Sequence, residues 1–359
     1  MSEVYSRERA GRWFLGSGIQ EPSGGVARFY LADARKNKPV STEITGYTAS
    51  ALAFLYSITG DSRFLDRARR TAFFLADCAW DSTLGIFPYE HPSPSAVSRH
   101  LAFFFDSGII VRGLLAVWRI TKEQRLLDAA VKAARGMLAD FHSGSDLHPI
   151  LVLPEKTPLE RDSHWSRSPG CYQAKSALAW REVAEISGET ALRDAYLETI
   201  SGALRGYRDF LPGTPERLRV MDRLHAASYF LEALSPLLGR AECAEAYRFT
   251  MQSVSEYMRE LAPEFARSDV YAQLLRARVY ASGTIPVDLA AAREEAAALA
   301  GFQAASPDPH LDGGFWFGRR GDVTIPHVNP VSTAFAAQAL EAWRAFEGGE
   351  PNPCLAPPI

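Results

Sequence analysis

An internal repeat constrains this chain more than any other feature. Six residues recur 62 positions further along the chain. The first copy has Gly46, Leu52, Ile58, Leu65, Asp66 and Ala68, and the second has Gly108, Leu114, Ile120, Leu127, Asp128 and Ala130. A third, weaker copy keeps Ile186 and Asp194. Each copy reads as a helical hairpin, which cannot bury its apolar face alone, so neighbouring copies must stack.

The rest of the chain also shows apolar residues at steps of three and four, and little strand alternation. We expect twelve helices, near residues 4–17, 43–58, 62–79, 107–120, 123–140, 171–186, 189–209, 222–237, 241–261, 268–281, 288–303 and 332–346. Short turns at 58–61, 120–123 and 186–189 join the two helices of a hairpin. Long connections at 80–106, 141–170, 210–221 and 304–331 hold most of the Pro and His residues.

Six such hairpins form either an open solenoid or a closed ring. The first and last helices are the only ones without a hairpin partner, and pairing them would close the ring. We therefore predict that helix 332–346 packs beside helix 4–17. The fold class that follows is all-α, an (α/α)6 toroid, with residues 1–359 as a single domain.

Charge and cysteine content exclude several classes. Lys and Arg number 39 against 42 Asp and Glu, which argues against a nucleic-acid partner bound through bulk charge. The four cysteines (Cys78, Cys171, Cys243 and Cys354) form no Cys-x-x-Cys pair, and the eight histidines show no metal-ligand spacing, so we expect no metal and no cofactor. We see no signal-peptide pattern at residues 1–14 and no membrane span, and expect a reduced, cytoplasmic protein; oligomeric state is left open.

Short motifs at the starts of the expected helices carry a resemblance. They are Glu-Ile-Thr-Gly-Tyr at 43–47, Thr-Gly-Asp at 59–61, Phe-Asp-Ser-Gly at 105–108 and Leu-His-Ala-Ala-Ser-Tyr at 224–229. They are similar to repeats of the six-hairpin glycosidase superfamily. The Asp106 segment resembles the His-Asp-x-Gly-Phe stretch of unsaturated glucuronyl hydrolases, although Phe105 replaces the His and Ile109 the Phe. The layout also resembles that of sugar epimerases. The resemblance implies the toroid more firmly than any one reaction.

In such a ring the starts of the inner helices face a common cleft. We expect Asp106 and Glu43 to be catalytic there, with Asp106 as general acid/base and Glu43 as its partner. Three neighbouring phenylalanines at 103–105 would desolvate Asp106 and raise its pKa, as a general acid requires. The alternative is that both carboxylates only satisfy free amides at helix starts.

Aromatic, imidazole, amide and arginine side chains near the same cleft are candidates for substrate binding. They are Tyr172, His164, Trp165, Arg167, His225, Asp269, Trp316 and Asn329. Aromatic faces stack on sugar rings, and arginine binds carboxylates with two parallel hydrogen bonds. The alternatives are a structural histidine at 225 and a solvated loop at 161–167 anchored by its Trp. Loop arginines at 99, 167, 319 and 320 favour an acidic sugar unless they pair with nearby Asp residues.

The leading hypothesis is a glycoside hydrolase that acts on an oligosaccharide or polysaccharide fragment, with uronic acid as a candidate component. A sugar epimerase or polysaccharide lyase, in which His or Tyr moves a proton at a sugar carbon, is the second. A non-catalytic helical-repeat scaffold is the third. We expect a carbohydrate partner, no nucleic acid and no membrane.

Overall fold

The computed structural model describes residues 5–91, 100–143, 146–162, 164–350 and 359. Twelve α-helices lie within them, at the positions predicted and with ends shifted by a few residues. They are α1 Arg7–Gly16, α2 Thr42–Thr59, α3 Ser62–Phe74, α4 Phe104–Thr121, α5 Gln124–Phe141, α6 Gln173–Ser187, α7 Thr190–Gly206, α8 Arg217–Leu234, α9 Ala241–Leu261, α10 Ser268–Tyr280, α11 Leu289–Ala300 and α12 Pro330–Glu347. One π-turn (Leu75–Ala79) extends α3, and short 3₁₀ turns follow α7 (Tyr207–Asp209) and α8 (Ser235–Leu237).

The short turns within hairpins have clear local causes. Gly60 ends α2 and Gly188 ends α6, each in the left-handed region (φ 69° and 77°) where glycine meets no side-chain penalty. Asp61 then caps α3 by accepting a hydrogen bond from the backbone N–H of Arg63. Two or three residues therefore determine where each of these helices ends and the next one begins, which is why these boundaries could be predicted from the sequence.

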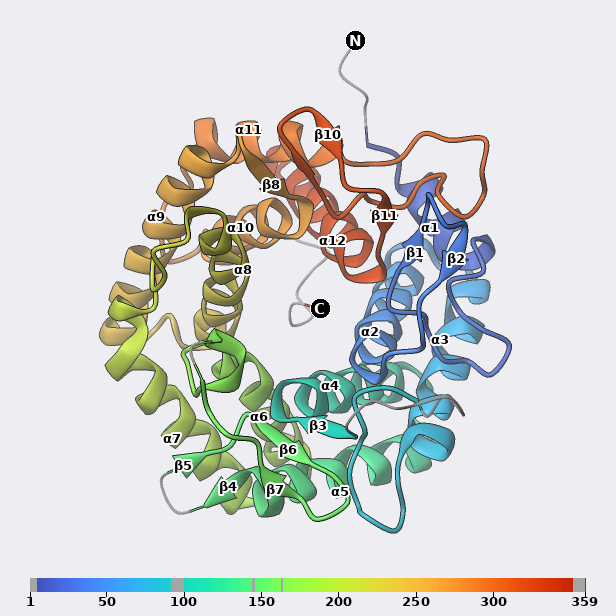
Figure 1. Cartoon of the computed structure of the whole chain (residues 1–359), viewed down its shortest axis with the longest axis vertical. Coiled ribbons are helices and arrows are strands. Elements are labelled where there is room, and N and C mark those ends of the chain that lie inside the picture. Colours follow the sequence, from blue (N-terminus) through green and yellow to red (C-terminus); the bar gives the residue numbers. More distant parts are fainter. Residues whose placement is uncertain (1–4, 92–99, 144–145, 163, 351–358) are drawn as a thin grey trace. The chain divides into compact units, whose positions relative to one another are not determined.

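The chain divides into two compact units. Unit 1 comprises Met1–Ile19, Phe29–Asn37 and Leu204–Ile359, and unit 2 comprises Gln20–Arg28 and Lys38–Ala203. The single domain proposed from the sequence stays a prediction. In unit 2, α2 packs on α4 and α4 on α6, while α3 and α5 pack against α2 and α4 (Figure 1).

The glycines of the sequence repeat allow this close packing. A Cβ atom on Gly46 would lie 2.9 Å from the Cα of Ile110 in α4. One on Gly108 would lie 2.0 Å from the hydroxyl oxygen of Ser176 in α6. The same repeat position thus brings α2 onto α4 and α4 onto α6, with backbones in direct contact.

In unit 1, α10 packs between α8 and α12, with α9 and α11 against them (Figure 1). Helix α1 packs beside α12, so the predicted pairing of the first and last helices is confirmed. Arg9 of α1 donates a hydrogen bond to Asp312 at 2.7 Å, and Trp13 donates one to the His310 carbonyl at 2.8 Å. The segments flanking these helices also pair, through Tyr30 and Val328.

Small antiparallel sheets in the segments between helices were not predicted. Unit 1 has β1 Tyr30–Leu31, β2 Lys36–Asn37 and β11 His327–Val328 in one sheet, and β8 Phe265–Arg267, β9 Gly318–Arg320 and β10 Val323–Thr324 in another. Unit 2 has β3 Leu101–Phe103, β6 Ile150–Val152 and β7 Thr157–Pro158 together, and β4 His142–Ser143 with β5 Asp146–Leu147. Strands this short show no alternation to detect. They matter because β3 runs directly into α4 and β8 into α10, which fixes where those helices begin.

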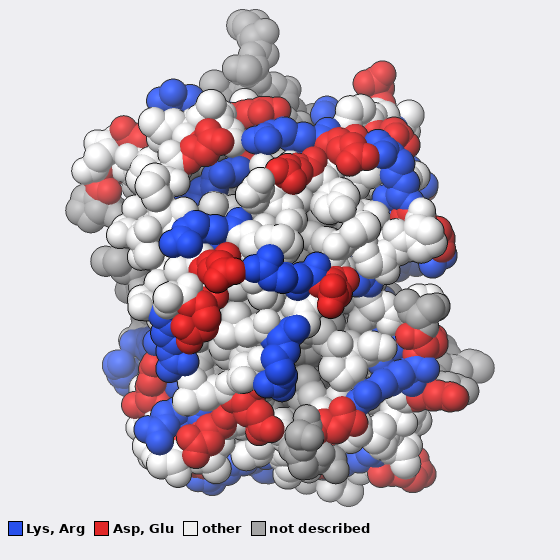
Figure 2. Space-filling model, turned by 90° about the vertical axis from the view of Figure 1, so that its left-hand side faces the viewer, with Lys and Arg blue, Asp and Glu red and all other residues white. Residues whose placement is uncertain are grey.

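Charges on the surface are mixed. Figure 2 shows Lys and Arg interspersed with Asp and Glu over the face that it draws. Ion pairs such as Arg135–Glu189 (3.0 Å) and Arg208–Glu245 (2.6 Å) link exposed side chains of opposite sign. This face therefore offers no extended basic area to a polyanion. In the described part of the chain, no helix combines the length and apolar character needed to cross a membrane.

Candidate functional site

Two carboxyl groups begin the inner helices of unit 2. Glu43 is the second residue of α2 and is half-buried, and Asp106 is the third residue of α4 and only 5% exposed. The side chain that caps α2 is Ser41, and α4 has no side-chain cap. The Oδ2 atom of Asp106 is buried and has no hydrogen-bond partner among the described residues. Ser41 rather than Glu43 therefore caps α2, whereas the Asp106 carboxyl also accepts a hydrogen bond from its own backbone N–H at the start of α4, so the capping alternative stays open for Asp106.

The environment of this pair favours the protonated form. Burial raises the pKa of Glu43 to about 7, against the opposing charges of Arg28 and Lys175. Burial also raises the pKa of Asp106 well above its usual range, and the nearby Glu43 carboxylate raises it further, with Arg28 opposing. Two like charges in one poorly solvated place do not both ionise readily. The pair consequently keeps a proton at a pH where isolated carboxyl groups have lost theirs.

Aromatic and cationic groups surround the pair. The Arg28 guanidinium donates a hydrogen bond to Glu90 and lies 4.5 Å from the ring centre of Tyr89. Burial raises the pKa of Tyr89, so its hydroxyl stays neutral. The Lys175 ammonium lies 4.9 Å from the ring centre of Tyr47, one helical turn after Glu43. Unit 2 thus holds two carboxyls, two cations and two tyrosines in electrostatic contact.

The aromatic residues predicted at 165 and 172 lie together beside Phe105, which precedes Asp106 in the chain. Trp165 packs edge-on against Tyr172 at 5.0 Å between ring centres, and Tyr172 lies 6.2 Å from the Phe105 ring. The Tyr172 hydroxyl lies 3.2 Å from the carbonyl oxygens of Ser166 and Ser168, which ties the loop to the start of α6.

Asp162 organises the other two candidates in this loop. Its carboxylate accepts from the backbone N–H of His164 at 2.7 Å and from the Arg167 guanidinium at 2.5 Å, and the His164 ring lies 3.0 Å away. His164 is exposed, and so is Arg167. Arg167 pairs with an Asp as the alternative interpretation proposed, while Arg99 lies outside the described residues.

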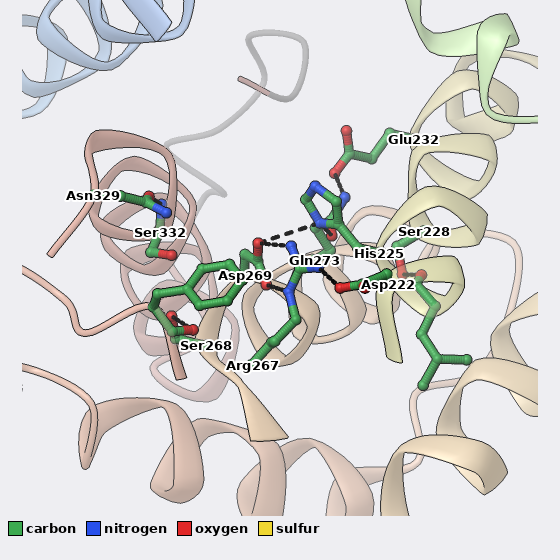
Figure 3. A network of polar contacts seen from close by, with 12 residues as sticks. Asp222, His225, Ser228, Glu232, Arg267, Ser268, Asp269, Gln273, Asn329 and Ser332 are labelled. Carbon is green, nitrogen blue, oxygen red and sulfur yellow. Dashed lines mark hydrogen bonds and ion pairs between the residues drawn. The ribbon is translucent and has the colours of Figure 1, made fainter. Parts of the chain in front are cut away.

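Unit 1 contains a second polar cluster, which is drawn in Figure 3. Arg267 at the end of β8 binds Asp269 through two hydrogen bonds, of 3.0 and 2.6 Å, and donates a third to Asp222 at 2.6 Å. His225 on α8 directs Nδ1 to the side-chain oxygen of Gln273 at 2.7 Å, with Asp269 at 3.4 Å. The two predicted residues His225 and Asp269 are thus brought together.

This cluster, which we call the arginine network, continues inward. Gln273 donates to Glu232 at 3.3 Å, and the fully buried Arg276 donates to Glu232 and to Gln338. Burial opposes ionisation of Asp269, but Arg267 and His225 outweigh it, so the pKa of Asp269 is lowered. The carboxylate of Asp269 is therefore charged and paired at neutral pH.

The remaining candidates of unit 1 lie around β11 and the start of α12. Asn329 caps α12, accepting from the backbone N–H of Ser332 at 2.6 Å. Trp316 accepts a hydrogen bond from the Ser268 hydroxyl on its backbone oxygen, at 2.7 Å. His327 lies between the rings of Phe29 (4.6 Å) and Phe317 (4.7 Å). Burial lowers the pKa of His327 to about 4, so this imidazole is neutral at pH 7.

Several charged residues of these clusters were not predicted as site residues, among them Arg28, Lys175 and Arg267. Lys175 carried a signal, since it is a lone charge within the otherwise uncharged run 171–180 of an inner helix. Arg267 stands two residues before Asp269. Within the described ranges no group of three His, Cys, Asp or Glu side chains is placed to hold a metal ion.

No protein-family model and no curated protein matches the sequence. Solved structures do match over almost the whole chain. The fold is that of the six-hairpin (α/α)6 toroids. The cellobiose 2-epimerase from Spirochaeta thermophila has a TM-score of 0.69 at 13% identity, covering 95% of this chain and 94% of its own. The unsaturated glucuronyl hydrolase from Bacillus sp. GL1 has 0.66 at 12%, covering 96% and 97%. A D-mannose isomerase has 0.66 at 9%, covering 95% and 96%.

These likenesses confirm the fold class and the resemblance seen in the sequence. The neighbours are a hydrolase, an epimerase and an isomerase, so the shared toroid does not select among reactions. The choice depends on the side chains of this chain.

Proposed function

We propose that this protein is a glycoside hydrolase acting on an oligosaccharide, with Asp106 as general acid and Glu43 as base. The observation that carries the proposal is the carboxyl pair, in which burial and the neighbouring Glu43 raise the pKa of Asp106 and its Oδ2 has no hydrogen-bond partner among the described residues. A carboxylic acid held neutral at pH 7 can protonate the departing glycosidic oxygen. A second carboxylate nearby then activates a water molecule or attacks the sugar carbon itself.

Binding of the sugar is proposed to use the aromatic groups around this pair. Trp165, which is partly exposed, is proposed to stack on a sugar face, and the buried Tyr172 packs edge-on against it beside Phe105. His164 and Arg167 lie in the same loop, while His225, Asp269, Trp316 and Asn329 are proposed binding residues of unit 1. A glucuronyl hydrolase among the structural neighbours, described as responsible for glycosaminoglycan degradation, is consistent with a glycan substrate.

A uronic-acid component stays a prediction of the sequence. The Arg319 guanidinium lies 5.7 Å from the ring centre of Phe302, and that of Arg320 lies 5.3 Å from the ring centre of Phe265. The preference for an acidic sugar is therefore a question for a binding experiment. Binding of a uronic-acid oligosaccharide and of its neutral counterpart, measured at low and moderate salt, tests it. Equal affinity without salt dependence would exclude the acidic preference.

The second candidate function is epimerisation or isomerisation of a reducing sugar. His225 is oriented by Gln273 and Asp269, and His327 is a neutral imidazole that is also within electrostatic range of Asp269. A neutral, oriented imidazole can remove a proton next to the carbonyl of an open-chain sugar. Two of the structural neighbours, an epimerase and an isomerase, make this reaction class the natural competitor.

One experiment separates the candidates. The protein is incubated with neutral and uronic-acid oligosaccharides in H₂¹⁸O and, separately, in D₂O, and products are analysed by mass spectrometry at early times. Hydrolysis yields shorter products carrying ¹⁸O, whereas epimerisation yields an isomer of unchanged length carrying deuterium on carbon.

Two variants assign the activity to a site. Asp106→Asn should stop the first reaction and His225→Asn the second. Asp140→Asn is the matched control, since Asp140 is in unit 2 and its partner among the described residues is Lys156, in an ion pair at 2.7 Å. Saturable binding of a glycan or a peptide without turnover would support the scaffold hypothesis instead.

A further inference from the structure

A lysine with no exposed surface lies beside the carboxyl pair. Lys175 is 0% exposed and stands in the first turn of α6. Lysine is almost never fully buried unless it is paired, and a cation near a helix N-terminus is also disfavoured by the helix dipole. Two penalties therefore act on this position, so favourable contacts at the ammonium group must offset them.

The packing of three helix starts defines those contacts. Ser176, the next residue on α6, donates hydrogen bonds to the carbonyls of Phe104 and Phe105 at 2.7 and 3.1 Å, which seats α6 against the start of α4. The Lys175 ammonium reaches the ring of Tyr47 on α2 at 4.9 Å. Because Tyr47 follows Glu43 by one helical turn, both lie on the same face of α2. Lys175 thus extends from α6 across to the Glu43 side of the pair.

The cations around the pair are distributed unequally. The titratable and charged groups that face it are Arg28, Tyr47, Tyr89, Glu90 and Lys175. Arg28 acts on both carboxyls and is itself bound to Glu90. The Lys175 ammonium lies over the ring of Tyr47, one turn from Glu43, and opposes the rise in the pKa of Glu43. The contact with Tyr47 therefore places Lys175 on the Glu43 side of the pair.

We propose that Lys175 is a positioning residue that holds the negative charge of the pair on Glu43 and leaves the proton on Asp106. The inference rests on the proposed function, because it states how the two carboxyls acquire different roles. Two nearby carboxyls of similar environment would share one proton without preference. A buried ammonium on one side stabilises the anion there and so makes Asp106 the acid and Glu43 the base.

Site-resolved titration tests this directly. The protein is labelled with ¹³C at Asp and Glu carboxyl carbons, and the two signals are assigned by their loss in Asp106→Asn and Glu43→Gln. In the wild type, Glu43 should titrate at lower pH than Asp106. In Lys175→Met, which keeps the side-chain length, the Glu43 titration should move up by about one pH unit or more, and the order of the two should be lost.

Two further variants sharpen the result. Lys156→Met removes a lysine of the same unit that pairs with Asp140, and it should leave both titrations in place. Lys175→Arg keeps the charge and should keep the order of titration. An unchanged Glu43 titration in Lys175→Met, or a larger move of Asp106 than of Glu43, would overturn the proposal.

A stability measurement covers the case in which Lys175→Met disturbs the fold. The change in melting temperature caused by Glu43→Gln should be less favourable in the wild type, where the substitution leaves a buried ammonium without its anion, than in Lys175→Met. Additive effects of the two substitutions would contradict the pairing. Both tests are made without substrate, so a failure to turn over any glycan would refute hydrolysis and leave the Lys175 result standing.

Where a substrate is turned over, the acid limb of the kcat/KM profile provides a third measurement. Lys175→Met should move that limb to higher pH by a similar amount, because Glu43 must be ionised to act as base. A uniform loss of kcat at all pH values would indicate a merely structural role and would contradict the proposal.

Discussion

The carboxyl pair of unit 2 and the arginine network of unit 1 each bury a carboxyl group at the start of a helix, but they shift its pKa in opposite directions. Both place carboxyl groups in the first turn of an inner helix, Asp106 in α4 and Asp269 in α10, at 5% and 2% exposure. Asp269 is held by two hydrogen bonds from Arg267, and its pKa is lowered. Asp106 faces a second carboxyl group instead, and its pKa is raised.

The difference shows that burial alone does not set the charge of a carboxyl group. A partner of opposite sign overrides desolvation at Asp269, whereas a like charge adds to it at Asp106. Both oxygens of Asp269 accept hydrogen bonds from Arg267, as in a supporting network. Asp106 instead has one buried oxygen without a hydrogen-bond partner among the described residues and a second carboxyl group nearby, and such perturbed groups cluster at sites of chemistry.

The largest expected effect is a loss of activity at Asp106 without a matching loss of stability, which distinguishes a catalytic residue from one that only stabilises the fold. Asp106→Asn should lower kcat by about 10²–10⁴-fold, the contribution of a positioned general acid, because an amide cannot give up the required proton. The melting temperature should stay within a few degrees of the wild type, since the substitution removes no hydrogen bond from Oδ2. Initial rates and thermal unfolding of this variant and of Asp140→Asn check both statements. Full activity in Asp106→Asn would remove Asp106 from the mechanism.

Removing the cation of the arginine network should instead cause a large loss of stability. Arg267→Met leaves Asp269 buried without its guanidinium partner, which typically costs about 3–5 kcal/mol of unfolding free energy. The double variant Arg267→Met with Asp269→Asn should recover part of that loss, since no buried charge then remains unpaired. Denaturant unfolding of the two variants measures this. A loss below about 1 kcal/mol in Arg267→Met would mean that the network does not support unit 1.

The sequence predicted the parts of this comparison that depend on local pattern. Helix positions followed from apolar spacing, and the repeat positions Gly46 and Gly108 correctly placed Glu43 and Asp106 at neighbouring helix starts. The partners of these carboxyls were not predictable in this way. Lys175 on α6 and Arg28 approach Glu43 only through tertiary packing, and the spacing of residues along the chain says nothing of which cation meets which anion.

Asn329 carried a local signal for a structural role besides the predicted binding role. Asn followed by Pro330 is a common start of a helix, with Pro in the first turn. The short strands β3 and β8 carried no such signal, because two or three residues cannot show alternation. They set the starts of α4 and α10, and with them the places of Asp106 and Asp269.

The two regions should also give opposite dependences of stability on pH. The pKa of Glu43 is about 7 in the folded protein, above its ordinary 4.5, so protonation stabilises the fold below about 4.5 and this contribution is lost as pH rises through 7. Asp269 has a lowered pKa, so its contribution is present above 3.8 and is lost as pH falls below that value.

Urea unfolding at pH 5, 6, 7 and 8 distinguishes these signs. The unfolding free energy of Glu43→Gln relative to the wild type should rise from pH 5 to pH 8, because glutamine has no proton to lose. That of Asp269→Asn relative to the wild type should stay level over the same range. Parallel curves for Glu43→Gln and the wild type would show that Glu43 titrates normally.

The smallest expected effect concerns Asn329 in unit 1, and it tests whether this residue only stabilises the fold or also binds the sugar. Asn329 caps α12 through its bond to the backbone N–H of Ser332 at 2.6 Å. Asn329→Ala should therefore cost roughly 1 kcal/mol of unfolding free energy, while Asn329→Asp, which also accepts this bond, should cost much less. If capping is the whole role, glycan affinity should be equal in both variants and in the wild type. A loss of affinity in Asn329→Asp without loss of stability would instead require that the amide contacts the sugar, and unit 1 would then contribute binding as well as support.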